Sequence, residues 1–323
     1  MNYFLIKMSF DTAVHFGASD SAQSLSTVND HILADTLFSA LCHTALQIGG
    51  EDTLQMLCKW VQDGEMLLSD TMPWRGKDCF LPKPYVHSDS RKEVSAAKRK
   101  GMKKLSWIPV RSFTDFSESV RGGDAFDPAE YQVFFGTEQE MVRAAVTEGE
   151  DARPYRVGAY QFAENCGLYV IAALKTEQQQ QILIQLMNVL GMGGIGGKIS
   201  SGYGKFHLQD QICLNHGRDE QEKWMYHALT QTRGRQLLLS ASLPKEDELY
   251  AVLDDAFYQL VRRSGFVASE TYADTPMKKK TQYYLRAGSM LSCRFAGDLY
   301  TVGTKGKHAV YRYGKPLFMG VDL

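Results

Sequence analysis

The chain has 323 residues, of which 44% are hydrophobic and 23% charged, and its formal net charge is −1. This is the composition of a globular protein with enough apolar residues for two cores. The near-zero charge excludes a global positive field that would attract nucleic acid, so any such affinity must come from local patches.

The six cysteines are far apart in the sequence and form no C-x-x-C pair. This spacing argues against a structural zinc site and a dense disulfide framework, so we expect no bound metal. No motif indicates a cofactor. The apolar segment at residues 1–16 is interrupted by Lys7 and Asp11 and predicts a strand rather than a signal peptide. No apolar run is long enough to span a bilayer, so we expect a cytoplasmic protein without a membrane partner.

The first part of the chain predicts strands and helices in alternation. Asp35 is expected to be the N-cap of the first helix, because an aspartate side chain can accept backbone N–H groups there. The elements are, in chain order, a strand at Tyr3–Phe10, a loop at Gly17–Asn29, a helix from Asp35 to Gly49-Gly50, a helix at Glu51–Gln62, and short strands at Glu65–Ser69 and Cys79–Leu81.

A long segment with little periodicity follows. Arg91–Lys104 is rich in lysine and arginine, and Arg111–Asp151 is rich in acids. So long an irregular stretch is unusual inside a domain, which indicates an insertion, either a projecting hairpin or a mobile loop.

Regular structure returns at two strands, Arg156–Phe162 and Gly167–Leu174. Thr176 and Gln179 resemble a capping box for a helix whose apolar face includes Ile182–Leu190, and a strand follows at Tyr203–Leu208. The order β-α-β-β, insertion, β-β-α-loop-β is typical of a decorated ferredoxin-like (RRM-like) domain.

The second half predicts another α+β domain, joined to the first near His216–Trp224. Apolar residues at helical spacing predict a helix at Pro244–Arg263, with Gly265 just beyond its end. The predicted strands are Gln236–Ser242, Phe266–Ser269, Thr281–Ala287, Met290–Phe295 and Phe318–Val321.

The glycine-rich run GMGGIGGKISSGYGKF at Gly191–Phe206 is the most distinctive motif. It contains G-x-G-x-x-G, but a helix precedes it and a strand follows, the reverse of a dinucleotide-binding fingerprint. A Walker A loop fails as well, because Ile199 follows Lys198. The remaining interpretations are a backbone that closely approaches a polyanion and a tight helix-to-strand turn. Seven glycines among fourteen residues exceed what a turn requires, so we favour phosphate contact.

Two further groups of residues invite functional and structural interpretations. Lys103 and Lys104 could hold phosphates and Trp107 could stack on a base, or the segment could be a solvated charged loop. Basic residues near the C-terminus, Lys278–Lys280, Lys305, Lys307, His308, Arg312 and Lys315, are less specific candidates.

Catalysis finds little support in the sequence. The histidines show no metalloprotease spacing and there is no G-x-S-x-G elbow, so we expect no enzyme. His15 and His31 could serve as acid or base in RNA cleavage, but a lone histidine is more often a structural hydrogen bonder.

Several segments together resemble a known family, and they keep its order along nearly the whole chain. FDTAVHFG, ADTLFSALC, RPYRVGAYQFAENCGLYVIA and the glycine run resemble the RAMP superfamily of CRISPR proteins. SGFVASETYADTPMKKK, GSML and GKHAVYRYGKPLFMGV are similar to the fourth subunit of type III-A (Csm) effector complexes.

This resemblance implies an α+β fold of two ferredoxin-like (RRM-like) domains, residues 1–215 and 216–323, with a β-hairpin thumb inserted at about 86–155. It implies a non-catalytic subunit in antiviral defence that binds the crRNA 5′ handle. The implied partners are the large polymerase-like subunit, the backbone RAMP subunit that cuts target RNA and, indirectly, the target RNA.

The resemblance places RNA contacts at the glycine loop 191–204, beside the first strand, and in the basic stretch. The implied contact residues are His15, Phe16, His31, Lys103, Lys104, Trp107, Gly193, Gly194, Gly196, Gly197, Lys198, Ser200, Ser201, Tyr203 and Lys205. The acidic segment Asp115–Asp151 receives no functional residue. Two alternatives remain: a RAMP-fold endoribonuclease that processes precursor crRNA with His15 or His31, and an assembly scaffold with incidental RNA contact.

Overall fold

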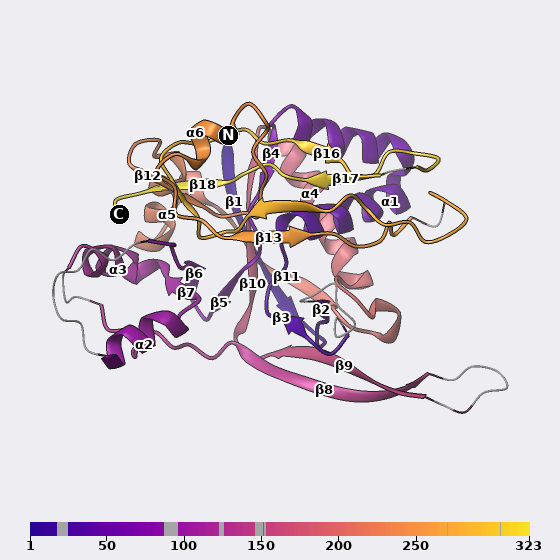
Figure 1. Ribbon diagram of the computed structural model, residues 1–323, viewed down its shortest axis with the longest axis horizontal. Coiled ribbons are helices and arrows are strands. Elements are labelled where there is room, and N and C mark those ends of the chain that lie inside the picture. The colour runs from indigo at the N-terminus through magenta and orange to yellow at the C-terminus, as the bar shows by residue number, and fades with distance from the viewer. Residues whose placement is uncertain are drawn as a thin grey trace.

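The structure is a computed structural model, shown in Figure 1. It describes residues 1–17, 25–86, 96–122, 126–145, 151, 153–269, 271–303 and 305–323, with the backbone alone at 96–99. It has mixed helices and antiparallel strands, which confirms the predicted α+β class.

An antiparallel sheet forms the centre of the first half. Its order is β11-β1-β10-β5-β6-β7, and β4 also pairs with β10. The strands are β1 (Asn2–Phe10), β4 (Met66–Leu68), β5 (Met72–Arg75), β6 (Asp78–Pro82), β7 (Trp107–Pro109), β10 (Cys166–Leu174) and β11 (Phe206–Cys213). Helix α1 lies between β1 and β4 in the chain, and helix α4 lies between β10 and β11; the ferredoxin-like topology of this half stays a prediction.

Helices α1 (Ala34–Gln62) and α4 (Glu177–Gly193) cover one face of this sheet (Figure 1). Helix α1 contains both predicted helices, and they meet at Gly50, whose φ of 68° breaks the helical geometry. Thr176 and Gln179 form the predicted capping box at the start of α4. These helices and the capping box could be predicted from the sequence because each depends on residues three or four positions apart.

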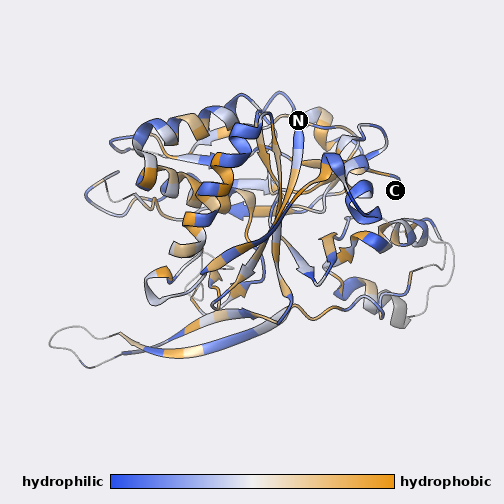
Figure 2. Cartoon of the chain, turned by 180° about the vertical axis from the view of Figure 1, so that it is seen from behind, coloured by the Kyte–Doolittle hydropathy of each residue, from blue (hydrophilic) through white to orange (hydrophobic). Residues whose placement is uncertain are grey.

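The alternation of β1 side chains divides the core in two. Phe4, Ile6 and Met8 point into the cluster beneath α1 and α4. Leu5 points to the other face, where the second half of the chain packs. Figure 2 shows the hydrophobic residues gathered along these central strands. This period of two is what a sheet buried on both faces requires.

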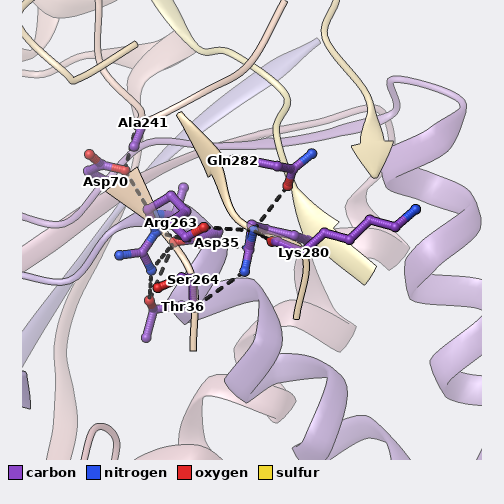
Figure 3. Close-up of polar contacts among 10 residues, drawn as sticks. Asp35, Thr36, Asp70, Ala241, Arg263, Ser264, Lys280 and Gln282 are labelled. Carbon is purple, nitrogen blue, oxygen red and sulfur yellow. Dashed lines mark hydrogen bonds and ion pairs between the residues drawn. The ribbon is translucent and has the colours of Figure 1, made fainter. Parts of the chain in front are cut away.

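The expected N-cap of α1 is wrong. Leu33 occupies that position and makes no side-chain cap bond, whereas Asp35 lies in the first turn. The orphan N–H of Ala34 is instead satisfied by Asp70, whose Oδ1 also accepts from the backbone N–H of Ala241 (Figure 3). The carboxylate of Asp35 is engaged by Arg263 from the second half.

The second half contains a small sheet in the order β15-β12-β18. Its strands are β12 (Arg235–Leu238), β15 (Met290–Leu291) and β18 (Phe318–Val321). Two hairpins pair β13 (Leu260–Arg263) with β14 (Gln282–Leu285) and β16 (Leu299–Thr301) with β17 (Tyr311–Tyr313). The helices are α5 (Glu220–Thr230) and α6 (Leu249–Leu253).

The predicted helix at Pro244–Arg263 is therefore wrong for most of its length. Only α6 forms, and Asp255 follows with a φ of 50° that no helix continues. Arg235 fixes this turn, because its guanidinium bonds both the carbonyl and the carboxylate of Asp255. Leu260 then pairs with Leu285 in a strand. This long-range pairing outweighs the helical spacing of the apolar residues in the sequence. The predicted strand Phe266–Ser269 is reduced to a bridge between Phe266 and Lys278.

A long hairpin, β8 (Gly136–Ala145) with β9 (Arg153–Phe162), projects from the rest of the chain (Figure 1). Its base is anchored by buried residues such as Val157 and Tyr160, while its outer part is exposed. The rest of the insertion is not one irregular stretch. It contains α2 (Ala96–Lys104), β7 and α3 (Phe113–Val120), and Phe113 and Phe116 of α3 join the core.

Candidate nucleic-acid interface

The glycine loop begins where α4 ends and is packed tightly over most of its length. Gly194, Gly196, Gly202 and Gly204 all have positive φ. A Cβ at Gly196 would lie 2.8 Å from the backbone oxygen of His15, and one at Gly204 would lie 2.0 Å from that of Ile195. Close packing thus explains these two glycines without any ligand. Only some of the loop is open to a polyanion.

The openings are at Gly193, along residues 198–202 and at Lys205. A Cβ at Gly193 would meet nothing within 4 Å. Ser200, Ser201 and Lys205 are exposed, and Lys198 is half-buried with a left-handed φ of 61°. Two hydroxyls and two ammonium groups therefore lie within one short loop segment, and groups of these kinds suit phosphate oxygens.

His15 and Phe16 lie beside the loop as predicted, but both are buried. The backbone N–H of Gly197 donates to the carbonyl of His15 at 2.8 Å. The Nδ1 of His15 lies 2.7 Å from the carbonyl oxygen of Gly158 in β9, and the residue is only 5% exposed. Phe16 belongs to the core. They connect the loop to the hairpin rather than present a free side chain.

The loop and the hairpin touch at two further points. The Nζ of Lys198 lies 5.1 Å from the centroid of the Tyr155 ring, a cation–π distance. The guanidinium of Arg143 donates to the hydroxyl of Tyr203, which is otherwise buried, at 3.4 Å. Arg143 and Tyr155 are directly opposite in the hairpin register, so one cross-strand pair engages the loop.

A second group of predicted residues gathers away from the loop. The Nδ1 of His31 lies 2.7 Å from Asp30, and the indole N–H of Trp107 donates to the other carboxylate oxygen at 3.4 Å. The rings of His31 and Trp107 meet edge to face at 5.2 Å. Burial raises the pKa of Asp30, but the hydrogen bond and charge of His31 and the bond from Trp107 outweigh it, so the pKa lies below its usual value. Trp107 is thus held in place rather than free.

This group borders a cavity of about 400 Å³, which Lys104 also lines. Lys103 is exposed on α2 and does not line it. The sequence therefore indicated the loop residues, whose RNA contacts stay a prediction, but it did not point to Asp30, Arg143, Tyr155 and Tyr160 as their neighbours or as cavity residues. The pairing of Arg143 with Tyr155 required the hairpin register, which the irregular pattern of β8 did not reveal.

Two basic residues near the C-terminus serve the fold instead of a ligand. Arg312 is buried and donates to the backbone carbonyls of Arg263 and Lys280. Lys315 is buried and donates to the carbonyl of Gln62. The expectation of exposed RNA contacts at these two positions is wrong, because a charge pattern in the sequence does not show which cations are buried. Among the described helices, none is both long and apolar enough to cross a membrane.

Comparison with known proteins matches both the fold and the sequence. The chain aligns over 100% of its length with chains in two crystal structures, a Csm3–Csm4 subcomplex of a type III-A CRISPR-Cas interference complex (TM-score 0.66, 15% identity, 100% of that chain) and a Csm1–Csm4 cassette with AMPPNP (TM-score 0.62, 15% identity, 99% of that chain). The model of the CRISPR Csm4 C-terminal domain matches residues 231–321.

Curated relatives extend the match to the whole chain. The protein Csm4 of Streptococcus thermophilus is 29% identical over 100% of both chains. Csm4 of Mycobacterium tuberculosis is 37% identical over 99% of this chain and 98% of the relative. With that identity over nearly the full length of both proteins, the chain belongs to the Csm4 family of type III-A CRISPR subunits.

Proposed function

We propose that this chain is a non-catalytic RNA-binding subunit that holds the crRNA 5′ handle and bridges the large polymerase-like subunit to the backbone RAMP subunit. One observation supports the RNA-binding part: the glycine loop, which contacts the hairpin through Lys198, carries the exposed residues Ser200, Ser201 and Lys205. This local concentration of donors explains how a chain of net charge −1 binds RNA, because the positive charge need only line one groove.

The bridging part is supported by the two kinds of solved assembly that the fold matches. One of them pairs Csm4 with Csm3 and the other pairs Csm4 with Csm1. A subunit that contacts both needs two separate surfaces besides its RNA surface. The β8–β9 hairpin, which reaches away from the core, is a suitable element for following RNA toward a neighbouring subunit.

The test is a charge reversal at the loop, Lys198→Glu with Lys205→Glu. For single-stranded RNA, the loss of two phosphate contacts makes the plot of log binding constant against log salt concentration less steep by about 1.4. The introduced acids weaken binding further. Fluorescence anisotropy with repeat-derived RNA at about 50 and 200 mM salt measures both effects. We expect at least roughly tenfold weaker binding at the lower salt.

A matched control is Lys59→Glu with Lys175→Glu, which makes the same change in net charge. Both lysines are exposed and pair with acids, Asp63 and Glu65. Lys175 precedes α4 and the glycine loop follows it, so the 17-residue helix separates them by about 25 Å. Equal RNA binding by the two double variants would contradict the proposal. Unchanged crRNA retention in the loop variant would favour the assembly scaffold.

A nuclease is the second candidate, and the His31–Asp30 pair is what favours it, because a carboxylate commonly orients a catalytic imidazole. His15 is a poorer candidate, since it is buried and its Nδ1 is already bonded. Pure protein incubated with repeat RNA without metal should leave the RNA intact. Cleavage that disappears in His31→Ala or His15→Ala would overturn the non-catalytic assignment.

A further inference from the structure

The cavity of about 400 Å³ lies beside the hairpin base and is separate from the glycine-loop surface. Its walls come from the end of β3 (Val28–Asn29), from β6, from the start of β7, from residues 131–136 and from β9. The volume falls in the ~300–1,000 Å³ range of small-molecule sites. A site of this size that mixes aromatic walls with a few polar groups has the composition of a ligand pocket.

Tyr160 is the first of the polar residues that line this cavity. Tyr160 is 8% exposed and lines the cavity, and its hydroxyl has no hydrogen-bond partner among the residues that the structure describes. Burial raises the pKa of Tyr160 far above its ordinary value, and the neighbouring charge of Asp30 raises it further. The group is therefore a protonated donor at neutral pH, and a ligand acceptor would satisfy it.

The carboxylate of Asp30 is the second polar group. Its pKa lies below the usual value, so it is ionised and can only accept. His31 and Trp107 bond one oxygen each and hold the carboxylate in place. Because a carboxylate offers about four acceptor positions, it can still accept two N–H groups from a ligand.

The remaining walls suit a flat ring. Trp107, Tyr131 and Phe134 line the cavity, and Tyr131 is itself supported by a stacking contact with Phe126 at 4.3 Å. Lys104, which is exposed, stands at the cavity with its charge available to a phosphate. Aromatic faces with one carboxylate, one hydroxyl and one ammonium group match a nucleotide.

We propose that this cavity binds a guanine base extruded from the RNA strand that lies on the glycine loop. Guanine alone among the RNA bases presents two adjacent donor sites, N1–H and the N2 amino group, to a carboxylate, and its O6 can accept from Tyr160. The inference rests on the proposed RNA-binding function. It deepens that function by naming the base that is read.

The loop surface and the cavity lie along the same strand, β9. Lys198 of the loop contacts the ring of Tyr155, and Tyr160, five residues further along the strand, lines the cavity. Five residues of a strand span about 17 Å, a length that about two to three nucleotides of an extended single strand can cover. One base can therefore enter the cavity while nucleotides a few positions away stay on the loop.

The test uses labelled nine-nucleotide oligouridylates with a central guanosine, a central inosine, or uridine throughout. Anisotropy should show the guanosine strand binding about fivefold more tightly than the all-uridine strand, with inosine intermediate because it lacks the N2 amino group. Tyr160→Phe and Asp30→Asn should each reduce this preference. Tyr284→Phe is the control, because it deletes a tyrosine hydroxyl that lies outside the cavity and has no hydrogen-bond partner among the described residues.

The outcomes separate this inference from the proposed function. If the Lys198→Glu, Lys205→Glu variant weakens all three strands while the wild type shows no guanosine preference, only the cavity assignment fails. If that variant leaves every affinity unchanged, the proposed function fails. Guanosine preference that survives in Tyr160→Phe overturns the assignment. If free GMP binds as tightly as the guanosine strand, both to the wild type and to the loop variant, the cavity does not need an RNA strand to supply the base. That result would overturn the assignment of the base to RNA.

Discussion

Asp70 joins the two halves of the chain through a single carboxylate oxygen. Its Oδ1 accepts from Ala34 at 2.7 Å and from Ala241 at 2.9 Å, and its Oδ2 has no partner within the described part of the chain. Burial raises the pKa of this carboxyl to about 6, although the two backbone bonds oppose the rise. The folded protein therefore binds the Asp70 proton more tightly than the unfolded chain, whose carboxyl keeps a pKa near 3.8.

The raised pKa of Asp70 makes the folded protein less stable as the pH rises. The stability contributed by the protonated carboxyl is full below about pH 4 and is lost as the pH rises through about 6, a change of about 3 kcal/mol. In Asp70→Asn the amide oxygen can still accept both N–H groups but cannot ionise. We expect wild type to lose stability relative to this variant between pH 4 and 7. Urea unfolding of both proteins at several pH values measures the difference, and a constant difference would contradict the prediction.

At the scale of elements, the glycine loop contains both closely packed glycines and an accessible one. At Gly204 the φ is 77° and a Cβ would lie 2.0 Å from the carbonyl of Ile195. Gly193 closes α4, and a Cβ there would meet nothing. Close packing or a positive φ therefore requires six of the seven loop glycines, and only Gly193 has room and backbone geometry for a side chain.

Gly204→Ala should consequently destabilise the protein by about 2 kcal/mol or more, because both the backbone conformation and the close carbonyl forbid a side chain. Gly193→Ala is the control and should leave the free energy of unfolding within about 1 kcal/mol of wild type. Thermal unfolding compares the two. Equal melting temperatures for both variants would show that the loop tolerates side chains and that its packing is looser than the structure indicates.

The same elements show what could be predicted from the sequence. Strand β1, strand β10 and the capping box of α4 depend on neighbouring residues, and all three were predicted. Asp35 and Asp30 each also have a partner that is far away in sequence, Arg263 and Trp107 respectively, and no local pattern revealed these two. The position of the glycine loop was predictable, but the division of its glycines into packed and open ones was not.

At the scale of the whole molecule, the halves are joined by a common core and by a polar network. Leu5 and Tyr169 of the central sheet share one cluster with Leu237 and Met319 of the second half. The predicted division at residues 215 and 216 stays a prediction. A shared core of this kind means that the residues matched by the family model, 231–321, are stabilised by the rest of the chain.

The network centres on Asp35, which is buried in the first turn of α1 (Figure 3). Arg263 from β13 binds it through two parallel bonds, Nε to Oδ2 at 2.8 Å and Nη2 to Oδ1 at 2.9 Å. Arg312 approaches the same carboxylate at 3.9 Å. Because the ions are withdrawn from water, the loss of one partner is costlier than the pair itself is stabilising.

Arg263→Ala should therefore reduce the free energy of unfolding by about 3 kcal/mol or more, since Asp35 remains buried with two longer contacts, to Arg312 and to the Thr36 hydroxyl. Adding Asp35→Asn should recover part of that loss, because the uncompensated charge is then removed. The control is Arg111→Ala, because Arg111 is exposed and its partner Asp78 is about half exposed to water, and it should cost less than about 1 kcal/mol. Equal losses for Arg263→Ala and Arg111→Ala in urea unfolding would show that the network does not join the two halves.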